Sequence, residues 1–322
     1  MPGVVETNPS SFNLINIKEI HPTFGAEVSG IDFSKPVPKE TFDEISAASA
    51  KYGVLVFRNT GLDDAGHVNF GRQFGELDDV APYNKAGRKN RLAFDELFDV
   101  SNLAPDGSLL APNSAKQHAE KANTMFHCDS SFNPRRAGYS LLLAHELPPP
   151  GTGGSTAFAD TRTAYDDLPA ALKEHLLEKD YIAAHNMWHS RKLGSPEFFK
   201  DLDPSTKYMS RHHLIQRHEA SGRMTMYIAS HLHHIEGLEE DESKKLFNLL
   251  YEHTQQPRYV TVVDWKQPGD LVVWDNTSVM HRATGGTFAN KYRRDMRRVT
   301  VHDGSSQAWG LNKHTDERQG LP

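Results

Sequence analysis

The sequence contains a single cysteine, Cys128, among its 322 residues. One thiol excludes an intramolecular disulfide and any zinc or iron–sulfur site that needs several cysteines. A metal site in this chain would therefore have to use histidine and carboxylate ligands, and 18 histidines are available.

Long apolar runs are also missing. No segment approaches the roughly 20 apolar residues of a membrane span, and residues 1–12 lack the basic start and apolar core of a signal peptide. The net charge of -6 provides no concentrated positive surface for nucleic acid. We therefore expect a cytoplasmic enzyme that acts on a small molecule, without nucleic-acid or membrane partners; the composition permits a homo-oligomer.

Internal repeats, low-complexity tracts and long linkers are absent as well. This predicts one domain over residues 1–322, with loosely ordered ends at about 1–12 and 304–322. Near the start, helices are predicted at 38–51 and 63–74, on either side of a buried strand at 53–57.

The middle and the end of the chain have a different pattern. Short β-branched or aromatic runs bounded by Gly, Pro and Asp predict strands at 139–144, 224–229, 259–265 and 270–274. Helical patterns intervene at 164–179 and 239–252, and the second places Leu246, Leu249 and Leu250 on one stripe. The chain is therefore expected to be mainly β with helical insertions.

A candidate metal site begins with His127 and Asp129. The two residues are separated by one position, so on an extended backbone both side chains leave the same face, whereas Cys128 points away. Far downstream, the apolar run that starts at Leu271 leads to a second imidazole, His281. Two histidines and one carboxylate form the facial set that holds iron(II) and leaves coordination positions open. Zinc could use the same residues, without redox chemistry.

The run 291–301 carries several arginines. If it is a strand, Arg294, Met296 and Arg298 share one face. Four residues at about 3.3 Å each separate the two arginine Cα atoms by roughly 13 Å, enough to hold two anions on either side of a metal. The planar fork of a guanidinium suits a carboxylate, and this pairing favours iron with organic acids over zinc.

Four motifs occur in order along the chain: His127–Phe132, Gly153–Asp160, Leu271–Asn276 with His281, and Arg293–Thr300. Together they resemble the taurine/dichlorophenoxyacetate dioxygenase family, and most of all its phenoxyacetate dioxygenase branch, over about Pro22 to Val301. The resemblance implies a double-stranded β-helix, or jelly roll. It also implies Fe(II), 2-oxoglutarate and O2 as cofactor and cosubstrates.

The resemblance further assigns roles to single residues. His127, Asp129 and His281 would bind the iron, and Arg294 together with Thr156 would bind the distal carboxylate of 2-oxoglutarate. The implied reaction converts 2-oxoglutarate to succinate and CO2 while a C–H bond of the substrate is oxidised. Hydroxylation is the first expectation; cleavage next to an ether oxygen or amine, desaturation and ring formation remain alternatives.

The substrate is expected to be a small anion, such as a carboxylate. By resemblance, Arg298 would lie near the substrate or the proximal carboxylate of 2-oxoglutarate, and Asn123 near the active site. A second inward cation is costly to desolvate unless an anion or a carboxylate neighbour compensates it. We therefore expect Arg298 to hold a carboxylate-bearing substrate whose apolar body rests near Val80 and Met296, although Arg298 could instead grip only the cosubstrate.

The sequence departs from the family pattern in places. Val80 stands where a taurine dioxygenase would offer a histidine to the sulfonate, which disfavours taurine. The intact Asp129 disfavours halogenation, since related halogenases lack this carboxylate. The interval between His281 and Arg294 is long for the family, so the loop at 283–291 is expected to be enlarged.

Two other motifs have plainer interpretations. His231, His233 and His234 resemble a second metal tract, but strand alternation would put His234 opposite the other two, which favours a structural or pocket-edge role. The run Gly151–Gly154 lacks the Lys-Ser/Thr ending of a phosphate loop and is read as a turn.

Two other functions remain open from sequence. One is a zinc hydrolase that uses His127, Asp129 and His281. The other is a non-catalytic jelly roll that binds a small anion through Arg294 and Arg298. Oxygen consumption coupled to succinate formation would separate the dioxygenase from both.

Overall fold

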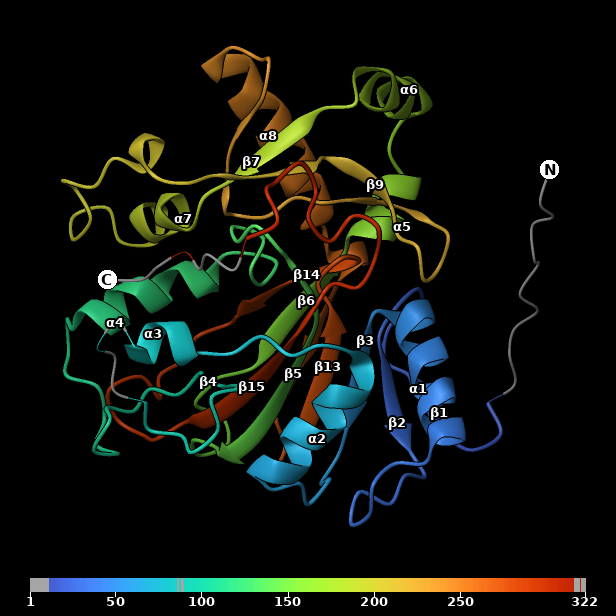
Figure 1. Ribbon diagram of the computed structural model, residues 1–322, viewed down its shortest axis with the longest axis vertical. Helices are drawn as coiled ribbons and strands as arrows, with labels where there is room; N and C mark the ends of the chain where they lie inside the picture. The colour runs from blue at the N-terminus through green and yellow to red at the C-terminus, as the bar shows by residue number, and fades with distance from the viewer. Residues whose placement is uncertain (1–11, 86, 88–89, 316–318, 320–322) are drawn as a thin grey trace.

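The computed structural model describes residues 12–85, 87, 90–315 and 319 (Figure 1). Most of the predicted loose N-terminal end, and the last residues of the predicted loose C-terminal end, lie outside these ranges. Among the described residues, no helix combines the length and the apolar character needed to cross a membrane.

The strands are β1 (Asn16–Glu19), β2 (Ala26–Ser29), β3 (Val54–Phe57), β4 (Leu97–Asp99), β5 (Ala137–Glu146), β6 (Thr156–Asp160), β7 (Ile182–His185), β8 (Ser210–His213), β9 (Ile215–Arg217), β10 (Met224–Met226), β11 (Leu232–Ile235), β12 (Val260–Val263), β13 (Leu271–Asp275), β14 (Val279–Ala283) and β15 (Asp295–His302). The α-helices are α1 (Lys39–Tyr52), α2 (Asp64–Phe74), α3 (Ala81–Lys85), α4 (Ala115–Glu120), α5 (Thr161–Asp166), α6 (Ala170–Lys179), α7 (Met187–Gly194) and α8 (Glu240–Thr254). Short 3-10 helices are η1 (Lys121–Thr124), η2 (Pro204–Thr206) and η3 (Pro257–Tyr259).

Two sheets form the centre of the molecule. The larger sheet has the strand order β1-β2-β3-β13-β5-β15-β4, and the smaller has the order β12-β6-β14. Pairing is antiparallel throughout both sheets except between β2 and β3. Two further small sheets, β11-β7-β8 and β10-β9, belong to the insertions.

Side-chain alternation on β3 explains how the large sheet is covered on both faces. Val54 and Val56 point toward the smaller sheet and share a buried cluster with Phe158 of β6. Leu55 and Phe57 point the other way and pack in the cluster that contains the apolar residues of α1 and α2. Because successive strand residues face opposite sides, a continuous apolar run is what a strand between two buried layers requires.

The two predicted N-terminal helices are confirmed, and their ends have clear causes. Gly53 ends α1 in the left-handed region with φ 71°, a conformation that glycine adopts without steric cost. The side chain of Asp63 caps α2 by accepting a hydrogen bond from the Gly66 N–H at 2.7 Å.

Three element predictions need correction. The single helix expected at 164–179 is two helices, α5 and α6, because Pro169 cannot continue a helix through its missing N–H and its ring. The strand expected at 224–229 ends at Met226. On α8, Leu250 is fully buried but its neighbour Leu249 is 53% exposed, since adjacent helix residues point about 100° apart.

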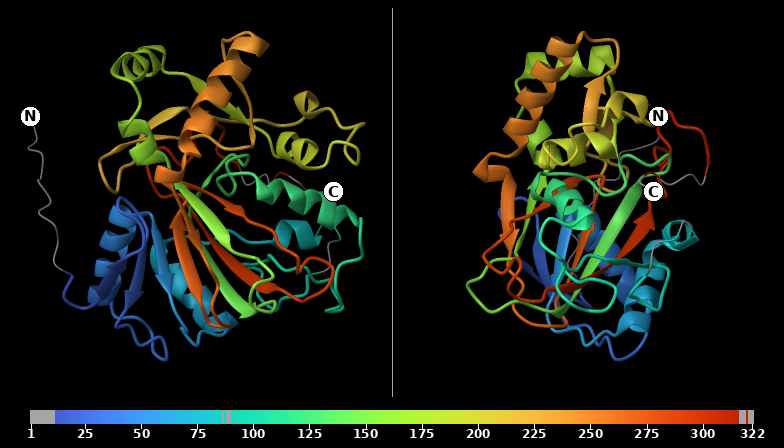
Figure 2. Two further views of the ribbon diagram at one scale, coloured as in Figure 1. Left: turned by 180° about the vertical axis from the view of Figure 1, so that it is seen from behind. Right: turned by 90° about the vertical axis from the view of Figure 1, so that its left-hand side faces the viewer.

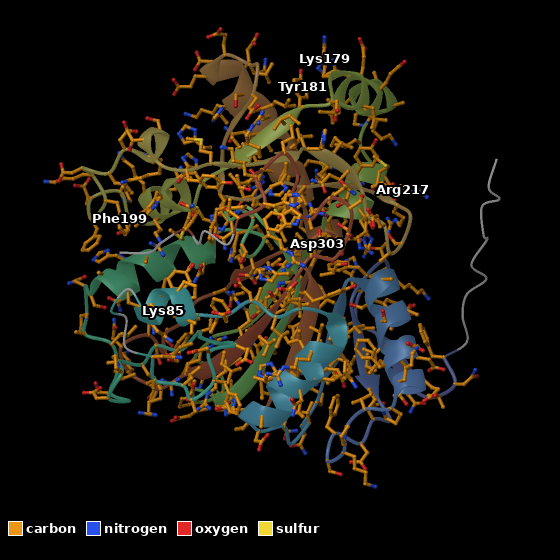
Figure 3. The ribbon with its side chains drawn as sticks, viewed as in Figure 1. Lys85, Lys179, Tyr181, Phe199, Arg217 and Asp303 are labelled. Carbon is orange, nitrogen blue, oxygen red and sulfur yellow. The ribbon has the colours of Figure 1, made fainter. Side chains whose placement is uncertain are left out.

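The helical insertions gather at one end of the two sheets (Figure 2). There α6 and α8 lie beside β7, away from α1 and α2. Lys179 and Tyr181 mark the junction between α6 and β7 (Figure 3), where Asp180 adopts φ 44° and its N–H donates to the Leu176 carbonyl at 3.2 Å.

The described part of the segment after Gly304 makes specific contacts, in contrast to the loose order expected for it. Ala308 is buried, and the amide of Asn312 donates to the Ser210 hydroxyl at 2.9 Å. These contacts attach the segment to the insertion sheet that contains β8.

Candidate metal centre

Backbone pairing brings the two candidate imidazoles together. His281 lies on β14, and it pairs with His127 through an isolated antiparallel bridge. Each residue donates its N–H to the other's carbonyl at 2.9 Å. Residues paired in this way project their side chains on the same side, and the two ring centroids are 4.2 Å apart.

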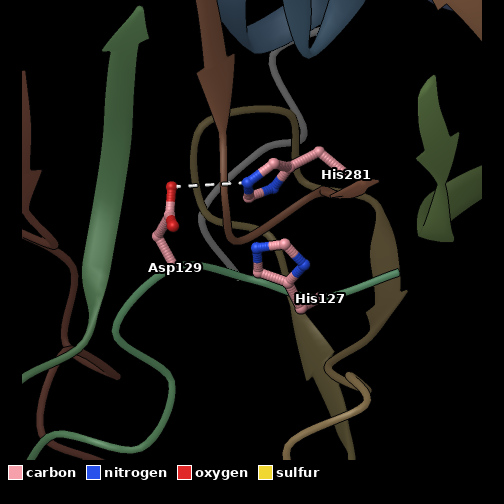
Figure 4. Close-up of side chains that lie close together, drawn as sticks. All are labelled: His127, Asp129 and His281. Carbon is pink, nitrogen blue, oxygen red and sulfur yellow. Dashed lines mark ion pairs between the residues drawn. The ribbon is translucent and has the colours of Figure 1, made fainter. Parts of the chain in front are cut away.

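Asp129 completes the group (Figure 4). One candidate ligand atom from each of His127, Asp129 and His281 lies within 4.8 Å of the other two. Asp129 Oδ2 is 3.6 Å from His281 Nε2. All three residues are buried, and no second group of three such ligands occurs in the part of the chain that the structure describes.

The protonation states suit metal ligation. Burial lowers the pKa of His127, and burial together with the neighbouring imidazole lowers the pKa of His281 to about 3. Burial opposes ionisation of Asp129, but the charge of Arg298, the two neighbouring imidazoles and the Ser140 hydrogen bond together outweigh it and hold the pKa of that carboxyl below its usual range. At neutral pH the site therefore presents two neutral imidazoles and one carboxylate, the forms in which these groups bind metals.

The orientation of each imidazole has a visible cause. His127 Nδ1 is 2.8 Å from the Met125 carbonyl, which can only accept, so Nδ1 carries the proton and Nε2 is left for a metal. The His281 ring packs against the indole of Trp274, with ring centroids 4.6 Å apart. This donor set fits a divalent metal with three protein ligands.

Arg294 lies next to the glycine-rich segment 151–154. Its Nη2 donates to the Gly154 carbonyl at 3.0 Å, while its buried Nε has no hydrogen-bond partner among the described residues. Desolvation lowers the pKa of Arg294 to about 10, with Glu120 acting in the opposite direction. Gly154 has φ +93°, and a Cβ built there would lie 3.2 Å from Arg294 Nε. A side chain at this position would be strained by the positive φ and would press on the guanidinium.

Thr156 opens β6 two residues after Gly154. Its side chain is buried, and Oγ1 accepts a hydrogen bond from Trp265 Nε1 at 3.3 Å. Asn123, in contrast, is exposed on η1. Thr156 therefore lies on the same segment as Gly154, whose carbonyl accepts from Arg294, whereas Asn123 lies on a surface turn.

Arg298 and Met296 occupy the same face of β15, as the predicted alternation requires. Arg298 Nη1 donates to Asp129 Oδ1 at 2.5 Å, and its Nε donates to the Thr300 hydroxyl at 3.1 Å. Arg298 therefore has a carboxylate neighbour already, so its charge alone does not require an anionic ligand. This differs from the expectation that another anion must compensate it.

The two residues expected near an apolar substrate body are buried. Met296 is fully buried between the two sheets, in the cluster that contains Phe158 and Trp274. Val80, which directly precedes α3, is 3% exposed, and its N–H donates to the Asp95 carbonyl. Neither side chain offers appreciable surface to a ligand in this conformation.

The histidine tract does not follow simple strand alternation. A register shift falls between Leu232 and His234, and the Nδ1 atoms of His233 and His234 lie 3.0 Å apart, so the prediction that these two face opposite sides is wrong. His231 packs against His127, with ring centroids 5.5 Å apart, and its Nδ1 is 2.7 Å from the Ser190 hydroxyl. It lies at the edge of the metal group.

Two residues in contact with Asp129 were missed from sequence. Ser140 donates to Asp129 Oδ2 at 2.7 Å, and Asn276 Oδ1 accepts from the Asp129 N–H at 2.9 Å. The available signal was a polar residue inside an otherwise apolar strand, as Ser140 is in β5.

Comparison with known proteins places this geometry in context. The family model "Taurine catabolism dioxygenase TauD, TfdA family" matches residues 16–300. An alpha-ketoglutarate-dependent 2,4-dichlorophenoxyacetate dioxygenase from Burkholderia sp. (strain RASC) is 36% identical over 289 residues, which cover 89% of this chain and 94% of that protein. An (S)-phenoxypropionate/alpha-ketoglutarate-dioxygenase from Sphingobium herbicidovorans is 32% identical over 86% of this chain and 91% of its own length.

A solved structure is also similar throughout. The crystal structure of AAD-2 in complex with Mn(II) and N-oxalylglycine superposes with a TM-score of 0.77 at 34% identity, covering 91% of this chain and 98% of that one. The structural similarity therefore extends over most of both chains.

Proposed function

We propose, because the chain belongs to the TauD/TfdA family of dioxygenases, that His127, Asp129 and His281 are its iron ligands. The protein is a non-haem Fe(II)- and 2-oxoglutarate-dependent dioxygenase, an oxidoreductase with succinate and CO2 as co-products. The zinc-hydrolase and non-catalytic alternatives are disfavoured, since relatives that match nearly the whole chain are named as dioxygenases.

The core is proposed to be a double-stranded β-helix within one domain. Support comes from the large sheet and the sheet β12-β6-β14, which enclose a common apolar cluster with the triad beside it.

The cosubstrate assignment rests on one observation, the buried and unpartnered Nε of Arg294. A guanidinium that loses water without gaining a full set of acceptors is costly, and a carboxylate satisfies its planar fork. Arg294 is therefore assigned to the distal carboxylate of 2-oxoglutarate, with the Thr156 hydroxyl as a second donor from β6. Gly154 holds the guanidinium in place through its carbonyl.

When bound, iron together with 2-oxoglutarate and O2 supplies the oxidant for a C–H bond. The chain's own residues bind and orient. The triad would hold the metal through two imidazoles and one carboxylate, and Arg294 would hold the distal carboxylate of the cosubstrate. The neutral imidazoles and the ionised Asp129 keep the ligand set ready at neutral pH.

The substrate is proposed to be a small anion that is hydroxylated. Relatives are named for phenoxyacetate and phenoxypropionate substrates, both of which are carboxylates. Arg298 is the cation nearest to the triad along β15, although it already forms an ion pair with Asp129. An anion that binds there would lie beside the metal group, next to the guanidinium that donates to Asp129.

Succinate formation tests the reaction class. The purified chain with Fe(II), ascorbate and 2-oxoglutarate is expected to form succinate in step with oxidation of an aryloxy or alkyl carboxylic acid. Replacement of Fe(II) by Zn(II) should abolish it, because zinc has no redox chemistry. Turnover of a substrate by the zinc-loaded protein without 2-oxoglutarate would support the hydrolase instead.

Matched acid and amide substrates test the anion. The acid should turn over faster in the wild-type protein, and Arg298→Gln should reduce this preference. Equal turnover of acid and amide by the wild-type protein would refute the anionic substrate while leaving the reaction class intact.

A further inference from the structure

Asp129 belongs to a closed ring of three hydrogen bonds with two fully buried polar residues. Asn276, directly after β13, accepts the Asp129 N–H on Oδ1 at 2.9 Å and donates from Nδ2 to the Ser140 hydroxyl at 3.0 Å. Ser140, on β5, in turn donates to Asp129 Oδ2 at 2.7 Å. The ring thus contacts both the backbone and the carboxylate of Asp129.

The direction of every bond in the ring is determined by its chemistry. Trp274 Nε1 and the Asp129 N–H can only donate, so the amide atom that faces both of them must be Oδ1 of Asn276. Nδ2 then faces Ser140 and the Gly138 carbonyl, at 3.3 Å. A serine hydroxyl has one proton, and because Ser140 accepts from Asn276, its proton is directed to Asp129.

The ring uses the full hydrogen-bonding capacity of Asn276. Two donors approach its carbonyl and two acceptors its amino group. A fully satisfied buried network is rigid, since any rotation of one member leaves a buried polar atom without a partner. The ring therefore restrains the Asp129 carboxylate at Oδ2, the oxygen that lies 3.6 Å from His281 Nε2.

We propose that Ser140 and Asn276 are positioning residues for the metal-binding carboxylate of Asp129. This inference rests on the proposed function. Ser140 orients the carboxylate through its hydrogen bond to Oδ2. Asn276 donates to the Ser140 hydroxyl, which directs the serine proton to Asp129, and it accepts the backbone N–H of Asp129. Without the ring, only Arg298, which donates to Oδ1, would still restrain the carboxylate, and the carboxylate would be less well oriented toward a metal. Groups that orient a ligand from behind typically change metal affinity by about 10- to 100-fold.

A purely structural role is the competing explanation, because the same bonds join β5 to the end of β13. The two explanations predict different results for the metal-free and metal-loaded protein. A structural role lowers the melting temperature of the metal-free chain and leaves its metal affinity unchanged. A positioning role lowers metal affinity in a chain that is still folded.

Co(II) titration of the full chain provides the test, since Co(II) reports both affinity and coordination geometry through its visible absorption. Ser140→Ala is expected to weaken Co(II) binding by about 10- to 100-fold and to alter the absorption bands. Ser243→Ala is a matched control: it also removes a buried hydroxyl, one that accepts the Ile235 N–H at 2.8 Å far from the triad. The control should bind Co(II) like the wild type.

Asn276→Asp adds a test of sign. The new carboxylate cannot donate to Ser140 and competes with Asp129 for the single serine proton, so positioning predicts weaker Co(II) binding. Added negative charge by itself predicts tighter binding. Co(II) affinity equal to or above that of the wild type in this variant overturns the proposal; if the variant does not fold, Ser140→Ala decides.

The outcomes also separate this proposal from the proposed function. Failure of the wild-type chain to bind Co(II) or to form succinate would remove the dioxygenase assignment. Normal binding and turnover by the wild type, with unchanged Co(II) affinity and spectrum in Ser140→Ala, would remove only the positioning role.

Discussion

Removal of the Arg294 guanidinium should weaken 2-oxoglutarate binding strongly and specifically. Truncation of one partner of a desolvated charge pair costs about 2 to 5 kcal/mol. At 1.4 kcal/mol for each factor of ten, this corresponds to a roughly 30- to several-thousand-fold higher dissociation constant. Nε is buried but the residue as a whole is only partly buried, which favours the lower half of that range.

The adjacent arginine is a suitable control for Arg294→Ala. Arg293 is more exposed and pairs with Glu146 on the surface, where both side chains are 45% exposed. Surface pairs of this kind contribute little, so Arg293→Ala should leave 2-oxoglutarate affinity nearly unchanged. Arg294→Lys should lie between, because lysine keeps the charge but loses the planar fork.

The assay is equilibrium binding of 2-oxoglutarate to the Mn(II)-loaded protein, followed by KM and kcat with Fe(II). We expect a large rise in the dissociation constant and in KM for Arg294→Ala, with metal affinity retained. An unchanged dissociation constant would refute the assignment of Arg294 to the distal carboxylate. An equal loss in Arg293→Ala would point to a general electrostatic effect instead.

Three further predictions concern the metal, the glycine-rich segment beside Arg294 and the response to pH. Asp129→Ala should abolish Fe(II)-dependent succinate formation in a folded protein, as judged by circular dichroism; normal turnover would exclude the triad. Gly154→Ala should raise the KM for 2-oxoglutarate because the new Cβ would lie 3.2 Å from Arg294 Nε, whereas Gly61→Ala, with similar positive φ but open space, should not. His67 is fully buried and its pKa is lowered from 6.5 to about 3. As pH falls, this imidazole is therefore protonated in the unfolded chain at a higher pH than in the folded chain. Stability should therefore fall below pH of about 6.5, by roughly 2 kcal/mol at pH 5 from this group alone, and His67→Gln should reduce that loss in urea unfolding.

Local sequence rules predicted the elements in which they act without competition. The helices α1 and α2 and the strand β3 follow from capping residues, apolar periodicity and a buried run. The local rules failed where one residue or one distant contact determines the structure. Pro169 divides α5 from α6, and a register shift in β11 places the Nδ1 atoms of His233 and His234 together. Propensity describes average preference, and these features depend on single positions.

The candidate site divides in the same way. The sequence by itself determined which residue types can bind a metal: one cysteine leaves histidine and carboxylate, and the spacing of His127 and Asp129 puts them on one face. It also determined the phase of β15, which aligns Arg298 with Met296.

Tertiary structure decided which groups actually meet. The bridge between His127 and His281 joins segments far apart in the chain, and nothing local encodes it. Likewise, only the assembled sheets direct Ser140 and Arg298 onto Asp129, and this changes the expected role of Arg298 from a cation in need of an anion to one that has a carboxylate partner. The physical reason is range: backbone alternation acts over a few residues, whereas hydrogen bonds and ion pairs act through space between whichever strands the fold makes neighbours.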